Sequence, residues 1–271
     1  MSDEILYDVT DPVATIRLNR PDKLNAMTHS MLRALRSAVN AASEDPRVVG
    51  IVITGEGRGF CAGLDASVLA ETSAAGSSTR APEQPGELLG LVSYLLRVPK
   101  PVIAAVNGPA AGGGFVLAML SDVRFASSAA SFTTVFSKRG LIAEHGTSWI
   151  LPRLVGAGRA LELLWSSRKV TADEALRIGL VEFVTEPGEL VTRAQDFVRE
   201  LAANVSPGSL RETKRLVYDH LGLGFEPALR DADAAQWRAL DRPDALEGAR
   251  SYLEKRPPHF ARLGAGAKEP Q

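Results

Sequence analysis

The sequence contains too little cysteine for cross-links or for cysteine-based metal binding. Cys61 is the only cysteine among 271 residues. A disulfide framework within the chain is therefore excluded, and so is a zinc site built from paired cysteines. A chain of this length buries about three quarters of its unfolded surface, so its core needs neither kind of support. The length favours one large domain, or one domain with an appendage.

The chain also has no excess of charge of either sign. Its 31 basic and 32 acidic side chains give a formal net charge of -1. No block of five or six like charges occurs, so we do not expect bulk electrostatic recognition of nucleic acid or of an anionic membrane. The composition, 45% hydrophobic and 23% charged, is that of a soluble globular protein. Acidic residues at positions 3–4, where a secretory signal carries basic ones, predict a cytoplasmic protein.

A long uninterrupted hydrophobic run is missing as well. No charged residue lies between Lys100 and Asp122, but Pro101, Pro109 and the triplet at 112–114 (Gly-Gly-Gly) interrupt that stretch. Inside a helix each glycine costs about 1 kcal/mol and each proline about 3 kcal/mol. The stretch is therefore predicted to be a buried strand, a tight turn and a helix that begins in glycines, rather than a membrane span.

Hydrophobic periodicity predicts an α/β core followed by helices. Residues 13–18 alternate as in a strand, and residues 48–53 form an apolar run that suits a parallel sheet covered on both faces. Thr28 is placed to cap a helix that follows it. From residue 187 onward only helical spacing remains. Residues 71–86 are rich in small and polar side chains and predict a surface loop that could act as a lid.

Two of the predicted strands run into glycine-rich turns. The first turn ends in Gly63, Leu64 and Asp65, and the second contains the glycine triplet. Glycine lets a backbone approach a ligand and expose its N–H groups, and a helix N-terminus favours negative charge. Each turn could therefore hold an anion or an oxyanion. Neither has the lysine or the spacing of a phosphate-binding loop. A purely structural role, in which the glycines permit close packing, stays open.

Several motifs together carry a family resemblance. Residues 18–27 (Leu-Asn-Arg-Pro-Asp-Lys-Leu-Asn-Ala-Met), 59–65 (Gly-Phe-Cys-Ala-Gly-Leu-Asp) and 100–108 (Lys-Pro-Val-Ile-Ala-Ala-Val-Asn-Gly) resemble the enoyl-CoA hydratase/isomerase (crotonase) family. Segments at 121–126, 151–156 and 247–260 agree with the same family and follow in its order. The resemblance thus covers nearly the whole chain.

The resemblance implies the architecture and the kind of substrate. Residues 1–200 are expected to form a crotonase-like spiral of ββα turns that binds acyl-CoA and contains the active site. Residues 201–271 are expected to form a C-terminal helical region that builds a homotrimer or a dimer of trimers. The implied substrate is an acyl-CoA or enoyl-CoA thioester, so coenzyme A enters as part of the substrate. No permanent cofactor, no metal, no nucleic acid and no membrane partner is implied.

The resemblance also assigns site residues. The backbone N–H groups of Leu64 and Gly113 would form an oxyanion hole for the thioester carbonyl, which acidifies the neighbouring carbon. Contacts with coenzyme A are implied for Lys23, Leu24, Ala26, Ala62, Gly63, Asp65 and Phe260.

The proton-handling residues depart from the family's hydratases. The two glutamates of those hydratases correspond to Val116 and Phe136 here, and neither side chain can hold a water or move a proton. Some isomerases of the family instead carry an acid in a segment similar to residues 140–146, and Glu144 falls on that position. A single carboxylate suits a 1,3-proton shift, because it can remove a proton beside the thioester and return it further along. A double-bond isomerase is therefore the favoured function.

Two other functions stay open. Glu144 together with a residue of the 71–86 loop could hydrate 2-enoyl-CoA in fatty-acid β-oxidation. The loss of both hydratase glutamates could also leave an acyl-CoA binder without catalysis. His145 could tune Glu144, and Cys61 is interpreted as a small buried residue rather than a nucleophile.

Overall fold

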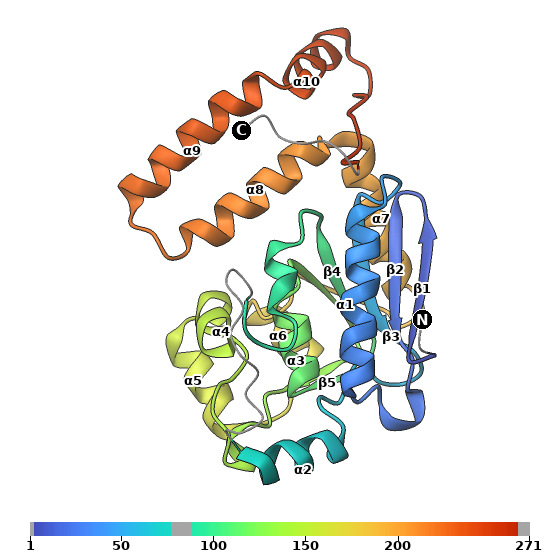
Figure 1. Ribbon diagram of the computed structural model, residues 1–271, viewed down its shortest axis with the longest axis vertical. Coiled ribbons are helices and arrows are strands. Elements are labelled where there is room, and N and C mark those ends of the chain that lie inside the picture. The colour runs from blue at the N-terminus through green and yellow to red at the C-terminus, as the bar shows by residue number, and fades with distance from the viewer. Residues whose placement is uncertain (1–2, 77–87, 265–271) are drawn as a thin grey trace.

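A six-stranded sheet forms the centre of the molecule (Figure 1). The computed structural model describes residues 3–76 and 88–264. The strand order is β1-β2-β3-β4-β6-β9; β1 and β2 form an antiparallel hairpin, and all other neighbours are parallel. The strands are β1 (Ile5–Thr10), β2 (Val13–Leu18), β3 (Gly50–Gly55), β4 (Val102–Val106), β6 (Val123–Ser127) and β9 (Phe183–Thr185).

Helices cover both faces of this sheet, because its central strands carry apolar side chains on each side. Val52 and Ile103 belong to the cluster under α7 (Leu190–Asn204). Ile51 and Ala104, one residue away on the same strands, belong to the larger cluster on the opposite face. That cluster packs under α1 (His29–Glu44) and α3 (Gly113–Met119). The predicted parallel sheet, buried on both faces, is confirmed.

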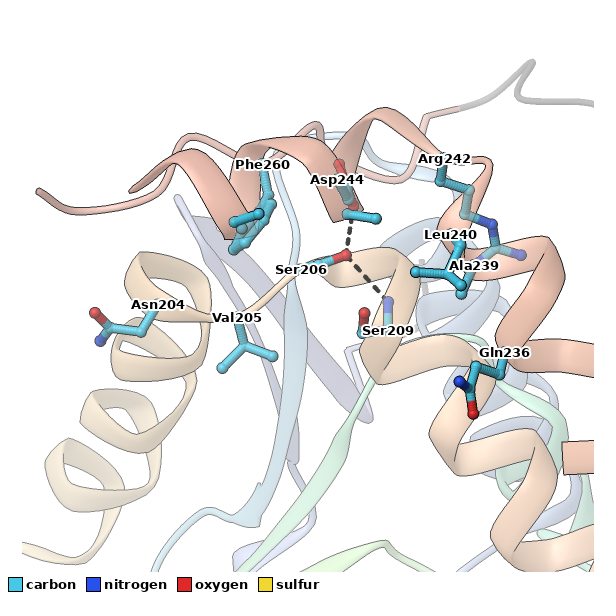
Figure 2. Close-up of a pocket in the computed structure, with 13 residues that line it drawn as sticks. Asn204, Val205, Ser206, Ser209, Gln236, Ala239, Leu240, Arg242, Asp244 and Phe260 are labelled. Carbon is cyan, nitrogen blue, oxygen red and sulfur yellow. Dashed lines mark hydrogen bonds between the residues drawn. The ribbon is translucent and has the colours of Figure 1, made fainter. Parts of the chain in front are cut away.

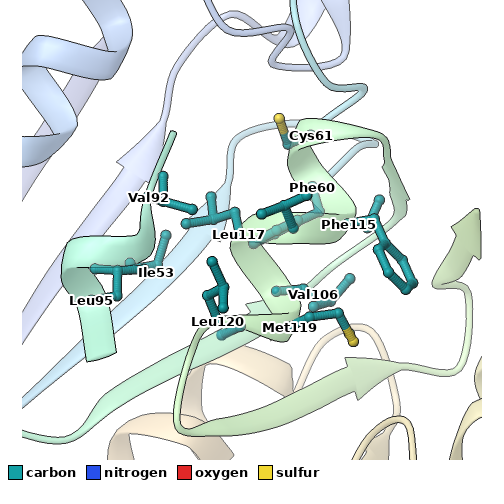
Figure 3. Close-up of a cluster of buried hydrophobic side chains, with 14 of the residues drawn as sticks. Ile53, Phe60, Cys61, Val92, Leu95, Val106, Phe115, Leu117, Met119 and Leu120 are labelled. Carbon is teal, nitrogen blue, oxygen red and sulfur yellow. The ribbon is translucent and has the colours of Figure 1, made fainter. Parts of the chain in front are cut away.

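A second, three-stranded sheet lies next to the first and positions α3. Its order is β5-β7-β8, with β5 (Pro109–Ala111), β7 (Ser131–Thr133) and β8 (Val170–Thr171). Helix α3 begins two residues after β5 and is buried along its whole length. Figure 3 shows its apolar side chains packed among Phe60, Cys61 and Ile53. The start of α3 is therefore held rigidly by the core.

Three helices at the C-terminal end stand at one end of the molecule (Figure 1). These are α8 (Pro207–His220), α9 (Phe225–Leu240) and α10 (Pro243–Glu254). Lys214 and Tyr218 of α8 bind the carboxylate of Asp122 at 2.7 and 2.9 Å, which ties α8 to the core. The predicted boundary between residues 200 and 201 falls inside α7. The other helices are α2 (Ala66–Ala75), α4 (Thr147–Val155), α5 (Ala157–Ser166) and α6 (Ala172–Arg177).

Most of the local predictions agree with the structure, and one is partly wrong. Thr28 caps α1, since its hydroxyl accepts a hydrogen bond from the N–H of Met31 at 3.0 Å. The predicted loop at 71–86, however, begins inside α2, which extends to Ala75. Residues 77–86 lie outside the described part of the chain. Four of the ten residues of α2 are alanine, so it has strong helix propensity. Val68 is its one buried residue, which leaves no hydrophobic period to recognise.

Candidate active site

The N–H group of Leu64 is left free by the local pairing of the backbone. Leu64 forms an isolated parallel bridge with Met27. In this bridge Met27 donates to the carbonyl of Gly63 at 2.7 Å, and Asp65 donates to the carbonyl of Met27 at 2.9 Å. The hydrogen bonds of the bridge are thus made by Gly63 and Asp65, the residues on either side of Leu64, and not by Leu64 itself. Among residues 3–76 and 88–264, no acceptor receives the Leu64 N–H.

Gly113 is the first residue of α3, and its N–H is also free within the described chain. The preceding N–H, that of Gly112, donates to Thr133 of β7 at 3.2 Å. The first N–H groups of a helix have no intrahelical acceptor, and the helix dipole makes this end favourable for negative charge. Gly113 therefore presents a buried donor at the start of a fully buried helix.

The two glycine-rich turns contact each other through their backbones. A β-carbon at Gly63 would lie 2.9 Å from the carbonyl oxygen of Ala111 and 3.2 Å from the nitrogen of Gly113. Gly63 also has a φ of +98°, which only glycine adopts easily. This close approach brings Leu64 and Gly113 to the lining of the same cavity.

Glu144 lies at the same place, in the loop between η4 (Ser137–Arg139) and α4. The structure brings all three predicted catalytic residues, Leu64, Gly113 and Glu144, to the lining of one small cavity of about 20 Å³. That volume admits about one water molecule. The carbonyl of Glu144 accepts hydrogen bonds from both the N–H and the hydroxyl of buried Thr147, at 3.0 and 2.7 Å. The side chain of Glu144 keeps 32% of its surface exposed, so substrate and solvent can reach it.

Apolar side chains occupy both positions that the family resemblance matches to the hydratase glutamates. Val116 is 1% exposed inside α3, and Phe136 is 3% exposed and lines the cavity with Glu144. Among the described residues that line this cavity, Glu144 is the only carboxylate. Glu144 is therefore the one carboxylate among these residues that could act as an acid or a base. Among the same residues the site lacks a second carboxylate that would orient a water.

His145 and Cys61 are the other titratable candidates near this site. The Nε2 atom of His145 lies 3.8 Å from a carboxylate oxygen of Glu144, which is longer than a hydrogen bond. Burial lowers the pKa of His145 and favours the neutral imidazole, although nearby Glu144 acts in the opposite direction. Burial raises the pKa of Cys61 to about 12, so its thiol stays protonated and is a poor nucleophile.

Six of the seven residues predicted to contact coenzyme A lie together beside the first turn. Ala62 donates to the carbonyl of Leu24 at 2.9 Å, and one Arg20 nitrogen binds both Asp65 and the carbonyl of Ala26. Lys23 ends the short helix η1 (Pro21–Lys23) and is exposed. Asp65 caps α2, because its carboxylate accepts a hydrogen bond from the N–H of Ser67 at 3.1 Å. This bond, with that from Arg20, lowers the pKa of Asp65 to about 2.

Phe260, the seventh of these residues, lies elsewhere in the chain. It lines a separate cavity of about 380 Å³ among the ends of α7 to α10, where its ring is 3.9 Å from the β-carbon position of Gly248 (Figure 2). Arg262 binds Asp11 at 3.2 Å, just before the start of β2, whereas Leu24 follows the end of that strand. Within a single chain Phe260 thus lies apart from the other six, and its contact with coenzyme A stays a prediction. The C-terminal helices place it at the far end of the sheet.

Sequence reasoning missed several residues of the cavity. Leu69 and Leu91 line it as ordinary leucines, without a motif that marks them. Val135 has a φ of +54°, a backbone conformation that no sequence pattern reveals for a β-branched residue. Arg139 also lines the cavity, and its position just before Gly140 in the motif segment was the one signal that would have identified it.

Comparisons with known proteins place the chain among relatives of one family. The chain matches the family model described as Enoyl-CoA hydratase/isomerase over residues 8–262. It is 34% identical over 265 residues to the putative enoyl-CoA hydratase/isomerase YngF of Bacillus subtilis. The matched region covers 94% of this chain and 97% of that protein. The chain is also 34% identical over 270 residues to the 1,2-epoxyphenylacetyl-CoA isomerase of Escherichia coli, with coverage of 96% and 99%.

Solved structures extend the likeness to the fold. An enoyl-CoA hydratase from Polaromonas sp. JS666 superposes with a TM-score of 0.87 at 31% identity, over 94% of this chain and 99% of that one.

Within the described residues, no cluster of three or more histidine, cysteine, aspartate or glutamate side chains is arranged to hold a metal ion. No helix in that part of the chain is long and apolar enough to cross a bilayer.

Proposed function

The chain belongs to the enoyl-CoA hydratase/isomerase (crotonase) family, and on that basis we propose that it is an enoyl-CoA double-bond isomerase with Glu144 as its single acid/base. One observation carries this proposal. Leu64, Gly113 and Glu144 line the same cavity, and among the described lining residues Glu144 is the only carboxylate.

The proposed reaction begins at the thioester carbonyl. Its oxygen accepts hydrogen bonds from the N–H groups of Leu64 and Gly113, and both bonds strengthen as the oxygen gains negative charge. Removal of one such donor typically raises the barrier by about 2.7–4 kcal/mol. The two donors therefore lower the cost of removing a proton from the carbon beside the thioester.

Glu144 transfers the proton in both directions. Its carboxylate takes a proton from the α-carbon of a 3-enoyl-CoA, and the electron pair moves into the carbonyl to give the enolate. As the enolate collapses, the double bond shifts into conjugation with the thioester, and the protonated Glu144 returns the proton to the γ-carbon. The product has the same atoms as the substrate, and the carboxylate is regenerated.

The apolar side chains around Glu144 support isomerisation over hydration. A hydratase must hold and activate a water molecule, whereas Phe136 and Val116 remove the two carboxylates that would do so. Hydration remains the competing function, because several relatives of the chain are named as enoyl-CoA hydratases.

We also propose that the protein forms a homotrimer or a dimer of trimers through its C-terminal helices. Large apolar side chains on α9 and α10 are exposed in the single chain: Phe225 by 82%, Trp237 by 61%, Tyr252 by 83% and Leu253 by 79%. Clustered exposure of this kind is typical of an interaction surface.

The proposed function is tested by offering 3-enoyl-CoA and 2-enoyl-CoA separately. We expect the 3-enoyl ester to become conjugated without a change in mass, and the 2-enoyl ester to gain water slowly or not at all. Rapid hydration of the 2-enoyl ester without isomerisation would establish the hydratase instead. Thermal stabilisation by acyl-CoA without turnover of either ester would identify a binder.

A further inference from the structure

The proposed oxyanion donor at Leu64 belongs to a peptide group whose other end is already bound. This peptide joins Gly63 to Leu64, and its carbonyl oxygen accepts a hydrogen bond from the N–H of Met27 at 2.7 Å. The peptide is trans, so its carbonyl and its N–H point in opposite directions. The bond from Met27 therefore fixes the direction of the Leu64 N–H.

The N–H of Met27 belongs to a second peptide group, and a guanidinium binds the other end of that group. This peptide joins Ala26 to Met27, and the carbonyl oxygen of Ala26 accepts a hydrogen bond from Nη1 of Arg20 at 2.5 Å. Hydrogen bonds donated by a charged group are about twice as strong as those between neutral groups. A hydrogen-bonded chain thus runs from the Arg20 cation through both peptide groups and ends at the Leu64 N–H.

Arg20 is held in place by its backbone and by its side chain. Its backbone N–H donates to the side-chain oxygen of buried Asn25 at 2.8 Å, and its carbonyl accepts from the Asn25 N–H at 2.9 Å. Its guanidinium also donates to the carboxylate of Asp65 at 2.9 Å and lies 3.5 Å from that of Glu4. These two carboxylates offset the field of the cation at longer range. Its effect on a thioester therefore passes through the hydrogen-bonded chain.

This chain matters for catalysis because hydrogen bonds in series polarise one another. A carbonyl that accepts a bond makes the N–H of the same peptide a stronger donor, by about 10–30% per bond. The N–H of Gly113 gains from the dipole of α3, whereas Leu64 lies outside any helix. We propose that Arg20 is a positioning residue, and that its guanidinium orients and polarises the Leu64 N–H through the two peptide groups. This inference rests on the proposed isomerase function and its oxyanion hole.

The first test measures the carbonyl stretching frequency of bound butanoyl-CoA, isotopically labelled at its carbonyl carbon. This ester has no double bond to move, so the infrared readout needs no turnover. Stronger hydrogen bonds to a carbonyl lower its stretching frequency. We expect the lowest frequency in the wild type and the highest in Arg20→Gln, which keeps a donor but has no charge. Arg20→Lys should lie between them, because it keeps the charge but not the planar fork of donors.

The second test is the turnover of 3-enoyl-CoA by the same variants. Loss of a whole oxyanion donor lowers kcat by about 10²- to 10³-fold. Arg20→Gln retains the Leu64 N–H in a less polarised form, so its kcat should fall by a smaller factor of about tenfold. The KM and the Kd for butanoyl-CoA should change far less than kcat, because a more strongly polarised donor acts mainly on the charge that develops in the transition state. Arg20→Lys should recover part of the lost kcat.

The matched control is Arg17→Gln. Arg17 lies three residues before Arg20 and pairs with Glu56 at 3.3 Å, so this variant removes a neighbouring guanidinium outside the hydrogen-bonded chain. It should leave both the frequency and kcat unchanged.

Two results would overturn the inference while leaving the isomerase proposal intact. One is bound butanoyl-CoA with the wild-type frequency in Arg20→Gln, even if kcat falls. The other is an equal rise in frequency in Arg17→Gln. Should Arg20→Gln fail to fold, the wild-type frequency in Arg20→Lys would overturn it in the same way. A wild type that shows the lowered frequency and its dependence on Arg20, yet isomerises no 3-enoyl ester, would refute the proposed function and support this inference.

Discussion

A β-carbon on Gly63 would lie 3.2 Å from the backbone nitrogen of Gly113. The two residues belong to different turns, one after β3 and the other at the start of α3. In the proposed mechanism this approach lets the N–H groups of Leu64 and Gly113 donate to one oxygen. The absence of a side chain at Gly63 is therefore part of the proposed oxyanion hole.

Gly63→Ala should damage catalysis and stability together. The added methyl would meet the Ala111 carbonyl at 2.9 Å, and alanine disfavours a φ of +98°. The resulting shift of the Gly113 donor should lower kcat by about 10²- to 10³-fold. The strain should lower the free energy of unfolding by about 1–3 kcal/mol. Enzyme assays and urea titration measure the two effects.

Gly158→Ala serves as the control for this substitution. Gly158 lies in α5, and a β-carbon there would meet nothing within 4 Å. Alanine at this position should leave kcat unchanged and the protein at least as stable, because it favours the helix. A Gly63→Ala enzyme with the wild-type kcat would refute the role given to the contact between the turns.

Lys100 should make stability depend on alkaline pH. Its ammonium group donates to the carbonyls of Ala42 and Asp45 at 2.9 and 2.7 Å, and the residue is 1% exposed. Burial lowers the pKa of Lys100 from 10.5 to about 8. Between pH 8 and pH 10.5 the side chain of Lys100 is protonated in the unfolded chain but has lost its proton in the folded chain. The free energy of unfolding should therefore rise with pH in this window, by up to about 1.4 kcal/mol per pH unit.

Lys100→Met isolates this contribution, since methionine does not titrate. The stability difference, wild type minus variant, should grow between pH 8 and pH 10.5 and stay constant below pH 8. Urea titrations at several pH values measure it. A difference that shrinks with rising pH would show that folding favours the charged lysine, contrary to this prediction.

Trp237→Asp should disrupt the proposed oligomer. Trp237 is 61% exposed on α9, and an aspartate there would place a charge in the predicted subunit interface. Sedimentation velocity should give a trimer or hexamer for the wild type and a smaller species for the variant. Ser37→Asp, at an exposed position of α1, should retain the wild-type assembly. A monomeric wild type would contradict the oligomer proposal.

Local structure was predictable where the chain has strong short-range signals. The strand predicted at 13–18 coincides with β2, and the buried strand predicted after Lys100 is β4, because branched and apolar residues suit a buried sheet. Thr28 and Asp65 were identifiable as caps from residue type and position. Residues 71–75 were predicted to lie in a loop but belong to α2, because this helix has one buried residue and therefore no amphipathic period.

Long-range contacts were harder to predict from the residues alone. The three short strands of the second sheet have two or three residues each, too few to show a period. The place of Glu144 came from the family resemblance rather than from any local pattern. The local sequence also does not show that Phe260 lies apart from the first turn within a single chain, because the path of α8 to α10 depends on long-range packing.

The most direct test of the account is the turnover of 3-enoyl-CoA by Glu144→Gln, with the Kd for an unreactive acyl-CoA measured in parallel. We predict a loss of about 10²- to 10⁴-fold in kcat with an unchanged Kd, because glutamine keeps the shape of the side chain but cannot accept the proton. Glu71→Gln, at an exposed carboxylate of α2, is the control and should match the wild type. A Glu144→Gln enzyme that isomerises 3-enoyl-CoA at the wild-type rate would contradict the single-carboxylate mechanism.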